Sequence, residues 1–224
     1  MSFFRGIFFD FDKIIFQLHF NVFASCKYRQ SRRKKMQKPP LVIHFVAGPC
    51  TGKTTVSAGV FHKLKCDGVS TELVPELVKR YIWKSFFNPA KFQLINDQYL
   101  MSDKHYKSFE PILQSGQVDV VVLDGSPLNS LWYNRNNKNN TSDIELTEKM
   151  IVERFRNLKA RPLVFFLNRD DRLEYTENGR IHTREEAIKM DCEIKKMLEK
   201  HNIKFVVANT YNINDIVSLI EHYL

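Results

Sequence analysis

The sequence predicts an α/β fold of three layers, in which helices cover both faces of a parallel sheet of five strands. Five short apolar runs alternate along the chain with segments whose apolar residues recur at helical spacing. The first run, LVIHFV at 41–46, is nearly continuous in its apolar character, as a parallel strand buried on both faces requires. Alternation of this kind implies βαβ units with right-handed crossovers.

Residues 39 to 125 supply the first elements in order. A helix is expected from Lys53 to about Cys66, because four apolar side chains recur there at helical spacing: Val56, Val60, Phe61 and Leu64. Two strands and two helices follow: strands at 70–74 and 118–124, and helices at about 76–84 and 92–114. Pro111 would bend or split the last of these helices.

The second half of the chain continues the alternation. After a short helix and the loop NRNNKNN, four apolar residues share one helical face: Ile144, Ile151, Phe155 and Leu158. Strands follow at 162–167 and 203–208, and Ile213–Leu224 closes the chain as a helix. Between these strands, the predicted helix Arg184–Lys200 aligns Ala187, Asp191, Ile194 and Leu198. Ligands of such sheets bind beyond the carboxyl ends of the strands, so functional residues are expected in the turns there.

The basic charge is concentrated in residues 1–38, which we interpret as an N-terminal extension outside a folded domain at 39–224. The extension holds nine Lys and Arg and two acids, a net +7 of the formal +9. Since the domain carries only about +2, the high pI is poor evidence that the domain binds nucleic acid.

The extension has no apolar stretch near the roughly 20 residues that span a bilayer, and it lacks the order of a secretory signal. It has three possible interpretations: a membrane-surface anchor, an organelle address, or an upstream segment that does not fold with the domain, with Met36 as the alternative start. The four cysteines form no CxxC pair, which predicts a reducing, cytoplasmic setting without structural zinc.

A phosphate loop is predicted between the first strand and the first helix. Residues 47–54, AGPCTGKT, match the pattern GxxxxGK[ST] with Ala47 in place of the first Gly. Small residues let backbone N–H groups surround phosphate oxygens, Lys53 reaches the outer phosphates, and the Thr54 hydroxyl is suited to Mg²⁺. The residues predicted to contact the nucleotide are Gly48, Pro49, Cys50, Thr51, Gly52, Lys53, Thr54 and Thr55.

Two acids follow neighbouring strands. Asp124 ends the strand VDVVVLD and is predicted to contact Mg²⁺ or substrate; the alternative is a helix N-cap. Glu76 follows the second strand and is a candidate general base; the alternative is a first-turn acid that complements a helix dipole.

The segment 168–187 has the composition of a lid, because it contains four arginines and a hinge glycine, Gly179. Arg172 and Arg180 are predicted to close over the phosphates during phosphoryl transfer. The other two arginines, Arg169 and Arg184, are expected only to pair with nearby acids: Asp170, Asp171, Glu185 and Glu186.

The phosphate loop, VPELVKRYIW at 74–83, Asp124 and RLEYTENGR at 172–180 together resemble the small P-loop kinases. The resemblance is greatest to the AAA/ATPase branch similar to the ribosylnicotinamide kinase domain of NadR and its phage-encoded relatives. It implies sheet order 2-3-1-4-5, ATP–Mg²⁺ as co-substrate, and an acceptor beside Glu76 and Asp124. The VPE segment also resembles deoxynucleoside kinases, but Asp124-Gly125-Ser126 replaces their Glu-Arg-Ser.

The predicted function is therefore ATP-dependent phosphoryl transfer to a nucleoside, nucleotide or related small molecule. On the helix expected at 92–114, five residues are candidates for the acceptor pocket, with Gln98 reading a base edge and Phe109 stacking: Gln93, Gln98, His105, Tyr106 and Phe109. One alternative is a regulatory protein that binds ATP or GTP with little or no transfer, attached to a membrane through residues 1–38. The other is a 5′-polynucleotide kinase, which the near-neutral domain disfavours.

Overall fold

The computed structural model describes residues 38–87, 95–170, 172, 175 and 182–224. Within the unit Pro39–Leu224, all pairings in the sheet are parallel and the strand order is β2-β3-β1-β4-β5. The strands are β1 (Leu41–Val46), β2 (Thr71–Val74), β3 (Val120–Leu123), β4 (Arg161–Asn168) and β5 (Val206–Asn209). The predicted fold class and strand order are confirmed.

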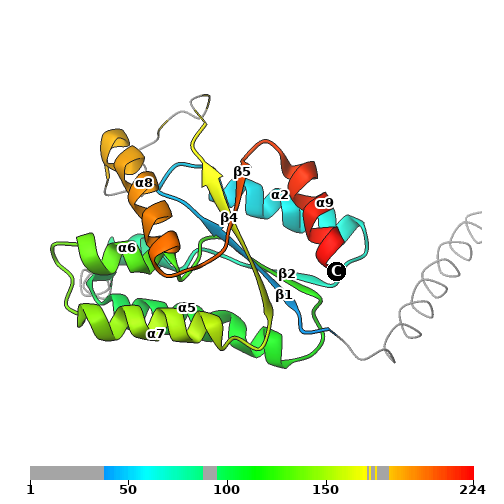
Figure 1. Cartoon of the computed structure of the whole chain (residues 1–224), viewed down its shortest axis with the longest axis horizontal. Helices are drawn as coiled ribbons and strands as arrows, with labels where there is room; N and C mark the ends of the chain where they lie inside the picture. The colour runs from blue at the N-terminus through cyan, green and yellow to red at the C-terminus, as the bar shows by residue number, and fades with distance from the viewer. Residues whose placement is uncertain (1–37, 88–94, 171, 173–174, 176–181) are drawn as a thin grey trace, which may run out of the picture. The chain divides into compact units, whose positions relative to one another are not determined.

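The helices of the described residues cover both faces of this sheet (Figure 1). They are α2 (Lys53–Cys66), α3 (Leu77–Ser85), α5 (Gln98–Gln114), α6 (Asn129–Asn136), α7 (Ile144–Arg156), α8 (Arg184–Lys200) and α9 (Ile213–Tyr223). Successive side chains of a strand point to opposite faces, so the core has two halves. Val42 and Val46 of β1 pack with α5, α7 and α8, whereas Leu41, Ile43 and Phe45 pack with α2 and α9.

Helix α5 has a capped N-terminus. Asp97 is its N-cap and accepts a hydrogen bond from the backbone N–H of Leu100, which fixes the first helical residue at Gln98. The predicted start at 92 lies outside the described residues. Pro111 stands inside α5 without ending it, since the helix continues to Gln114. In the described part of the chain, no helix has both the length and the apolar character needed to cross a membrane.

Two uncharged histidines are built into the core. His44 on β1 is fully buried, with Nδ1 3.0 Å from the Ser126 hydroxyl, and its ring meets Phe155 edge-on. Burial, together with a smaller contribution from the neighbouring His105, lowers the pKa of His44 to about 3. Burial likewise lowers the pKa of His105 to about 4. Both rings are therefore neutral in the folded protein at physiological pH.

We expect these histidines to make the fold sensitive to acid. Their folded pKa values lie below the ordinary value of 6.5, so protons bind preferentially to the unfolded chain as the pH falls below 6.5. The free energy of unfolding should fall by about 2 kcal/mol for each histidine by about pH 5. Urea unfolding at several pH values measures this, and His105→Gln should remove about half of the decline. Equal stability of the wild type at neutral pH and at pH 5 would contradict the prediction.

Candidate active site

The loop between β1 and α2 has the backbone of an anion-binding turn. Cys50 and Gly52 have positive φ angles of 61° and 82°, and the Thr51 hydroxyl donates to the Gly48 carbonyl at 3.1 Å. Gly52 is the N-cap of α2, and the first turn of α2 contains no acidic residue. Because Gly52 has no side chain, the first N–H groups of α2 are left for a ligand, and the helix end carries partial positive charge.

The Lys53 ammonium is held inside this loop. Nζ donates to the carbonyl oxygens of Ala47 at 3.0 Å and Gly48 at 2.6 Å. Burial lowers the pKa of Lys53, while the carboxylates of Glu76, Asp191 and Asp124 act in the opposite direction. The loop thus presents a cation at its centre, with acids from three other parts of the chain around it.

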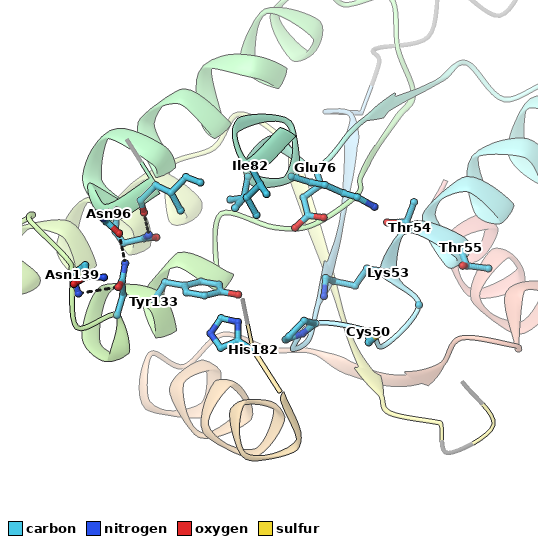
Figure 2. Close-up of a pocket in the computed structure, with 17 residues that line it drawn as sticks. Cys50, Lys53, Thr54, Thr55, Glu76, Ile82, Asn96, Tyr133, Asn139 and His182 are labelled. Atoms are coloured by element: carbon cyan, nitrogen blue, oxygen red, sulfur yellow. Dashed lines mark hydrogen bonds between the residues drawn. The ribbon is translucent and has the colours of Figure 1, made fainter. Parts of the chain in front are cut away.

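A cavity of about 270 Å³ opens from this loop. Lys53, Thr54 and Thr55 line one end of it, and Glu76 and Ile82 line the side formed by α3 and the residue before it (Figure 2). Figure 2 shows Asn96 and Asn139 at the other end, with Tyr133 and His182 between them and the loop. Gln98 and Asn137 also line the cavity. The cavity therefore joins a phosphate-binding end to a recess with hydrogen-bonding groups.

Glu76 lies in the wall of this cavity, and Figure 2 shows its carboxylate directed into the cavity between Lys53 and Tyr133. It occupies the N-cap position of α3 but makes no side-chain cap hydrogen bond there. Burial raises the pKa of Tyr133, and the charge of Glu76 contributes to the rise. Glu76 therefore places a carboxylate in the cavity beside Lys53.

Asp124 is buried below the phosphate loop, with 7% of its surface exposed. Burial raises its pKa, opposed first by a hydrogen bond from Thr54 and then by Lys53 and Lys79. Its Oδ1 atom has no hydrogen-bond partner among the described residues. Helix α6 begins only at Asn129, with Leu128 as its N-cap, so Asp124 does not cap it.

The oxygens of Thr54 and Asp124 fit a magnesium ion. A buried carboxylate oxygen without a partner lies beside a hydroxyl, and Mg²⁺ prefers oxygen ligands and keeps several waters. The described part of the chain holds no group of three or more His, Cys, Asp and Glu side chains that could bind a metal.

The predicted nucleotide-binding residues divide into two sets. Six of the eight line the cavity: Pro49, Cys50, Gly52, Lys53, Thr54 and Thr55. The other two, Gly48 and Thr51, do not line the cavity. Thr51 is fully buried, and the Thr210 hydroxyl donates to the Thr51 carbonyl at 2.5 Å. These two residues support the loop rather than line its open side.

The predicted lid arginines are described only in part. Arg172 is exposed, bonds to Asp170 at 2.6 Å, and lies 4.4 Å above the Tyr211 ring. It does not line the cavity in this structure. Arg180 lies outside the described residues, so both proposed roles stay predictions.

Most of the predicted acceptor residues lie elsewhere. Tyr106 and Phe109 are fully buried in the core, and the Tyr106 hydroxyl donates to the Ile151 carbonyl at 3.0 Å. Stacking of a ligand on Phe109 is therefore wrong, because its ring belongs to the core of the fold. Gln98 does line the cavity, His105 is buried beside Phe109, and Gln93 lies outside the described residues.

Sequence reasoning missed the aromatic wall of the cavity. Tyr133 and His182 lie with ring centroids 5.7 Å apart, and Trp132 packs on both rings while its indole N–H donates to Glu193 at 2.7 Å. The only hint in the sequence is the pair Trp132-Tyr133 shortly after a strand-end acid. His182 comes from a segment 50 residues later, so no local pattern predicts the contact.

The structure gives Arg169 a partner that the sequence did not predict. Its guanidinium bonds to Asp191 on α8, with Nε 2.8 Å from Oδ2, and to the Pro49 carbonyl at 2.8 Å. Asp191 in turn accepts from the Gly48 backbone N–H at 2.7 Å. Helix α8 brings this carboxylate to the loop, and local acids in the sequence concealed the true pairing.

A parallel sheet of this strand order, with a phosphate loop between its first strand and first helix, defines the P-loop NTPase fold. Residues 42–215 match the family model of an AAA domain, and the chain belongs to that family.

Two solved structures are similar to the chain. The crystal structure of NadR protein in complex with NAD and AMP-PNP has a TM-score of 0.58 and 13% identity, over 83% of this chain and 49% of that chain. The structure of a deoxyadenosine kinase from M. mycoides, with products dCMP and a flexible dCDP bound, has a TM-score of 0.46 and 15% identity. The match covers 82% of this chain and 97% of that chain. The chain thus spans about half the length of the NadR structure. The search of curated proteins found no match.

Proposed function

We propose that this protein transfers the γ-phosphoryl group of ATP–Mg²⁺ to a nucleoside, a nucleotide or a related small molecule. One observation carries the proposal. A single cavity joins the loop around Lys53 to a recess beyond Glu76 that is lined by aromatic rings and amides. Its volume of about 270 Å³ is near that of small-molecule sites, which are concave and present a few polar groups.

The residues at the loop end would bind the triphosphate. The backbone N–H groups at the start of α2 and the Lys53 ammonium neutralise phosphate charge, which is the main task of a protein in phosphoryl transfer. Thr54 and Asp124 would hold Mg²⁺, which supplies further charge neutralisation when bound. Arg172 and Arg180 would add positive charge over the phosphates.

Glu76 would act on the acceptor. As the acceptor hydroxyl oxygen forms its bond to the γ-phosphorus, the bond from that phosphorus to the bridging oxygen of ADP breaks. The Glu76 carboxylate takes the hydroxyl proton. Tyr133 and His182 would contact the rest of the acceptor, because they form the opposite wall of the cavity.

A panel of acceptors tests the proposal. The full chain and Lys53→Ala are supplied with ATP–Mg²⁺ and, in turn, nucleosides, ribosylnicotinamide, nucleoside monophosphates and a 5′-hydroxyl oligonucleotide. ADP and phosphorylated product are followed together. Product from one small acceptor, lost in Lys53→Ala, supports the kinase. Product from the oligonucleotide alone would identify a 5′-polynucleotide kinase, and binding of ATP or GTP without any product would identify a regulatory protein.

Replacing Glu76 by Gln should separate transfer from binding. Gln keeps the size of the side chain but cannot take a proton, so turnover should fall by about 10²- to 10⁴-fold while ATP affinity changes little. Single-turnover product formation and ATP titration measure the two effects. Glu72→Gln is the matched control, because Glu72 on β2 is exposed and forms an ion pair with Lys65. Unchanged turnover in Glu76→Gln would assign the base to another group.

The proposed domain division assigns all of this chemistry to residues 39–224. Residues 1–38 would form an extension outside the catalytic domain, with a membrane surface as one proposed partner and the cytoplasm as the proposed compartment. Liposome flotation of the full chain, with anionic and neutral vesicles compared, tests the membrane contact.

A further inference from the structure

Arg169 and Asp191 form an ion pair behind the phosphate loop. Their side chains bond to the loop backbone on either side of the Gly48–Pro49 peptide group. Asp191 Oδ1 accepts from the Gly48 N–H at 2.7 Å, and Arg169 Nη2 donates to the Pro49 carbonyl at 2.8 Å. The two side chains bond to each other through Arg169 Nε and Asp191 Oδ2 at 2.8 Å, and each is only 13% exposed. The pair therefore fixes both a donor and an acceptor of the loop.

Gly48 is the residue that permits this approach. A Cβ atom on Gly48 would lie 2.6 Å from Asp191 Oδ1 and 3.0 Å from the Ala187 carbonyl oxygen of α8. Both distances are shorter than side chains normally allow, so α8 packs directly on the loop backbone. A backbone this close to a helix cannot shift towards it.

A second support of the loop comes from the turn after β5. The Thr210 hydroxyl donates to the Thr51 carbonyl, and a Cβ atom on Gly52 would lie 2.4 Å from Thr210 Cγ2. The loop is thus held from behind at residues 48 and 49 and again at residues 51 and 52. Its open side keeps the N–H groups at the start of α2 and the Lys53 ammonium.

The charges of the pair depend on each other. Burial raises the pKa of Asp191, and Arg169 and the Gly48 N–H oppose that rise. Arg169 also lies close enough to Lys53 to disfavour the charge of its ammonium. Removing Asp191 would leave two neighbouring cations without the carboxylate between them, which is costly at a buried position.

We propose that Arg169 and Asp191 are positioning residues that hold the loop in the shape that receives phosphates, and so set nucleotide affinity without touching the nucleotide. The proposal rests on the proposed ATP site. A small displacement of groups that contact a ligand is enough to weaken binding strongly, and supporting side chains determine that precision.

The test measures the dissociation constant of ATP–Mg²⁺ with the full chain, together with thermal unfolding of each variant. Asp191→Ala should weaken ATP binding roughly 10-fold or more. Asp191→Asn keeps an oxygen for the Gly48 N–H and should recover part of that loss. Arg169→Lys keeps the charge but cannot donate to Asp191 and to the Pro49 carbonyl in the same way, so its affinity should lie between those of Asp191→Ala and the wild type.

Arg154→Ala is the matched control. Arg154 forms a comparable, partly buried ion pair with Asp103 and Glu110 that joins α7 to α5, away from the loop. The Arg154→Ala variant should have a lower unfolding temperature, as the loop variants do, but the same ATP affinity as the wild type.

The outcomes separate this inference from the proposed function. If the wild type binds ATP and folded Asp191→Asn and Arg169→Lys bind it equally well, the positioning role is wrong and the ATP site stands. An equal loss of affinity in Arg154→Ala would also overturn the positioning role, because it would reduce the effect to general stability. If the wild type binds no nucleotide, the proposed function fails and the inference fails with it.

Discussion

Replacing Lys53 by Ala should lower phosphoryl transfer by about 10²- to 10³-fold, the usual cost of removing one group that stabilises developing charge. The Lys53 ammonium is held by the Ala47 and Gly48 carbonyls, at the point where the loop surrounds its ligand. No other described side chain places a cation inside the loop, since Arg169 lies behind it. ADP formation and the ATP dissociation constant, measured on the full chain, report the loss.

The stability of this variant should stay near that of the wild type or rise. Burial lowers the pKa of Lys53, which means that the charged ammonium is less favourable in the folded protein than in the unfolded chain. Lys63→Ala is the control on the same helix, because Lys63 lies in the last turn of α2 and pairs with Asp67 at the surface. Full activity in Lys53→Ala, or an equal loss in Lys63→Ala, would contradict the assignment of the loop.

The sequence predicts best the elements whose burial is complete. Strands β1 and β3 are buried along their whole length, so their residues are almost all apolar, with His44 on β1 as the exception. Strand β5 lies at the edge of the sheet and is mostly exposed, and the pattern misplaces it. The apolar run IKFVVA predicts a start at residue 203, because Ile203 is apolar and packs in the core although it precedes the strand. A buried loop position and a buried strand position both require an apolar residue, so the sequence pattern does not distinguish them.

The phosphate loop is predictable for a different reason. Its function requires particular residues at fixed spacing within one turn, so Gly52, Lys53 and Thr54 can be identified without knowledge of the rest of the fold. The acceptor wall has no such local rule. Tyr106 and Tyr133 are both tyrosines on helices, and only tertiary packing places the first in the core and the second in the cavity.

The supports of the loop were the least predictable part of the site. Asp191 falls in line with Ala187, Ile194 and Leu198, so the helical pattern places it on the buried face of α8. A carboxylate on a buried face needs a partner, and that requirement is visible in the sequence. The partner is not visible, because Arg169 has closer acids in the chain and reaches Asp191 only through packing of α8 beside β4.

Replacing Gly52 by Ala should damage both stability and ATP binding. Gly52 has a φ of 82°, and an added Cβ would lie 2.4 Å from Thr210 Cγ2 and 2.9 Å from its hydroxyl oxygen. The left-handed backbone costs about 1–2 kcal/mol for a residue with a side chain, and the steric overlap adds about 1–3 kcal/mol. Relief of the overlap would move the loop away from Thr210 and break the hydrogen bond to the Thr51 carbonyl. Urea unfolding and ATP titration of the full chain measure the two losses.

Gly116→Ala separates the two causes. Gly116 has a similar left-handed φ of 62°, but an added Cβ there would meet no atom within 4 Å. This control therefore carries the backbone strain without the overlap, and it lies in the turn after α5 rather than in the loop. We expect Gly116→Ala to lose about 1–2 kcal/mol of stability and no ATP affinity. If Gly52→Ala loses no more than Gly116→Ala, close contact with Thr210 does not shape the loop, and its geometry depends on residues 48 and 49 alone.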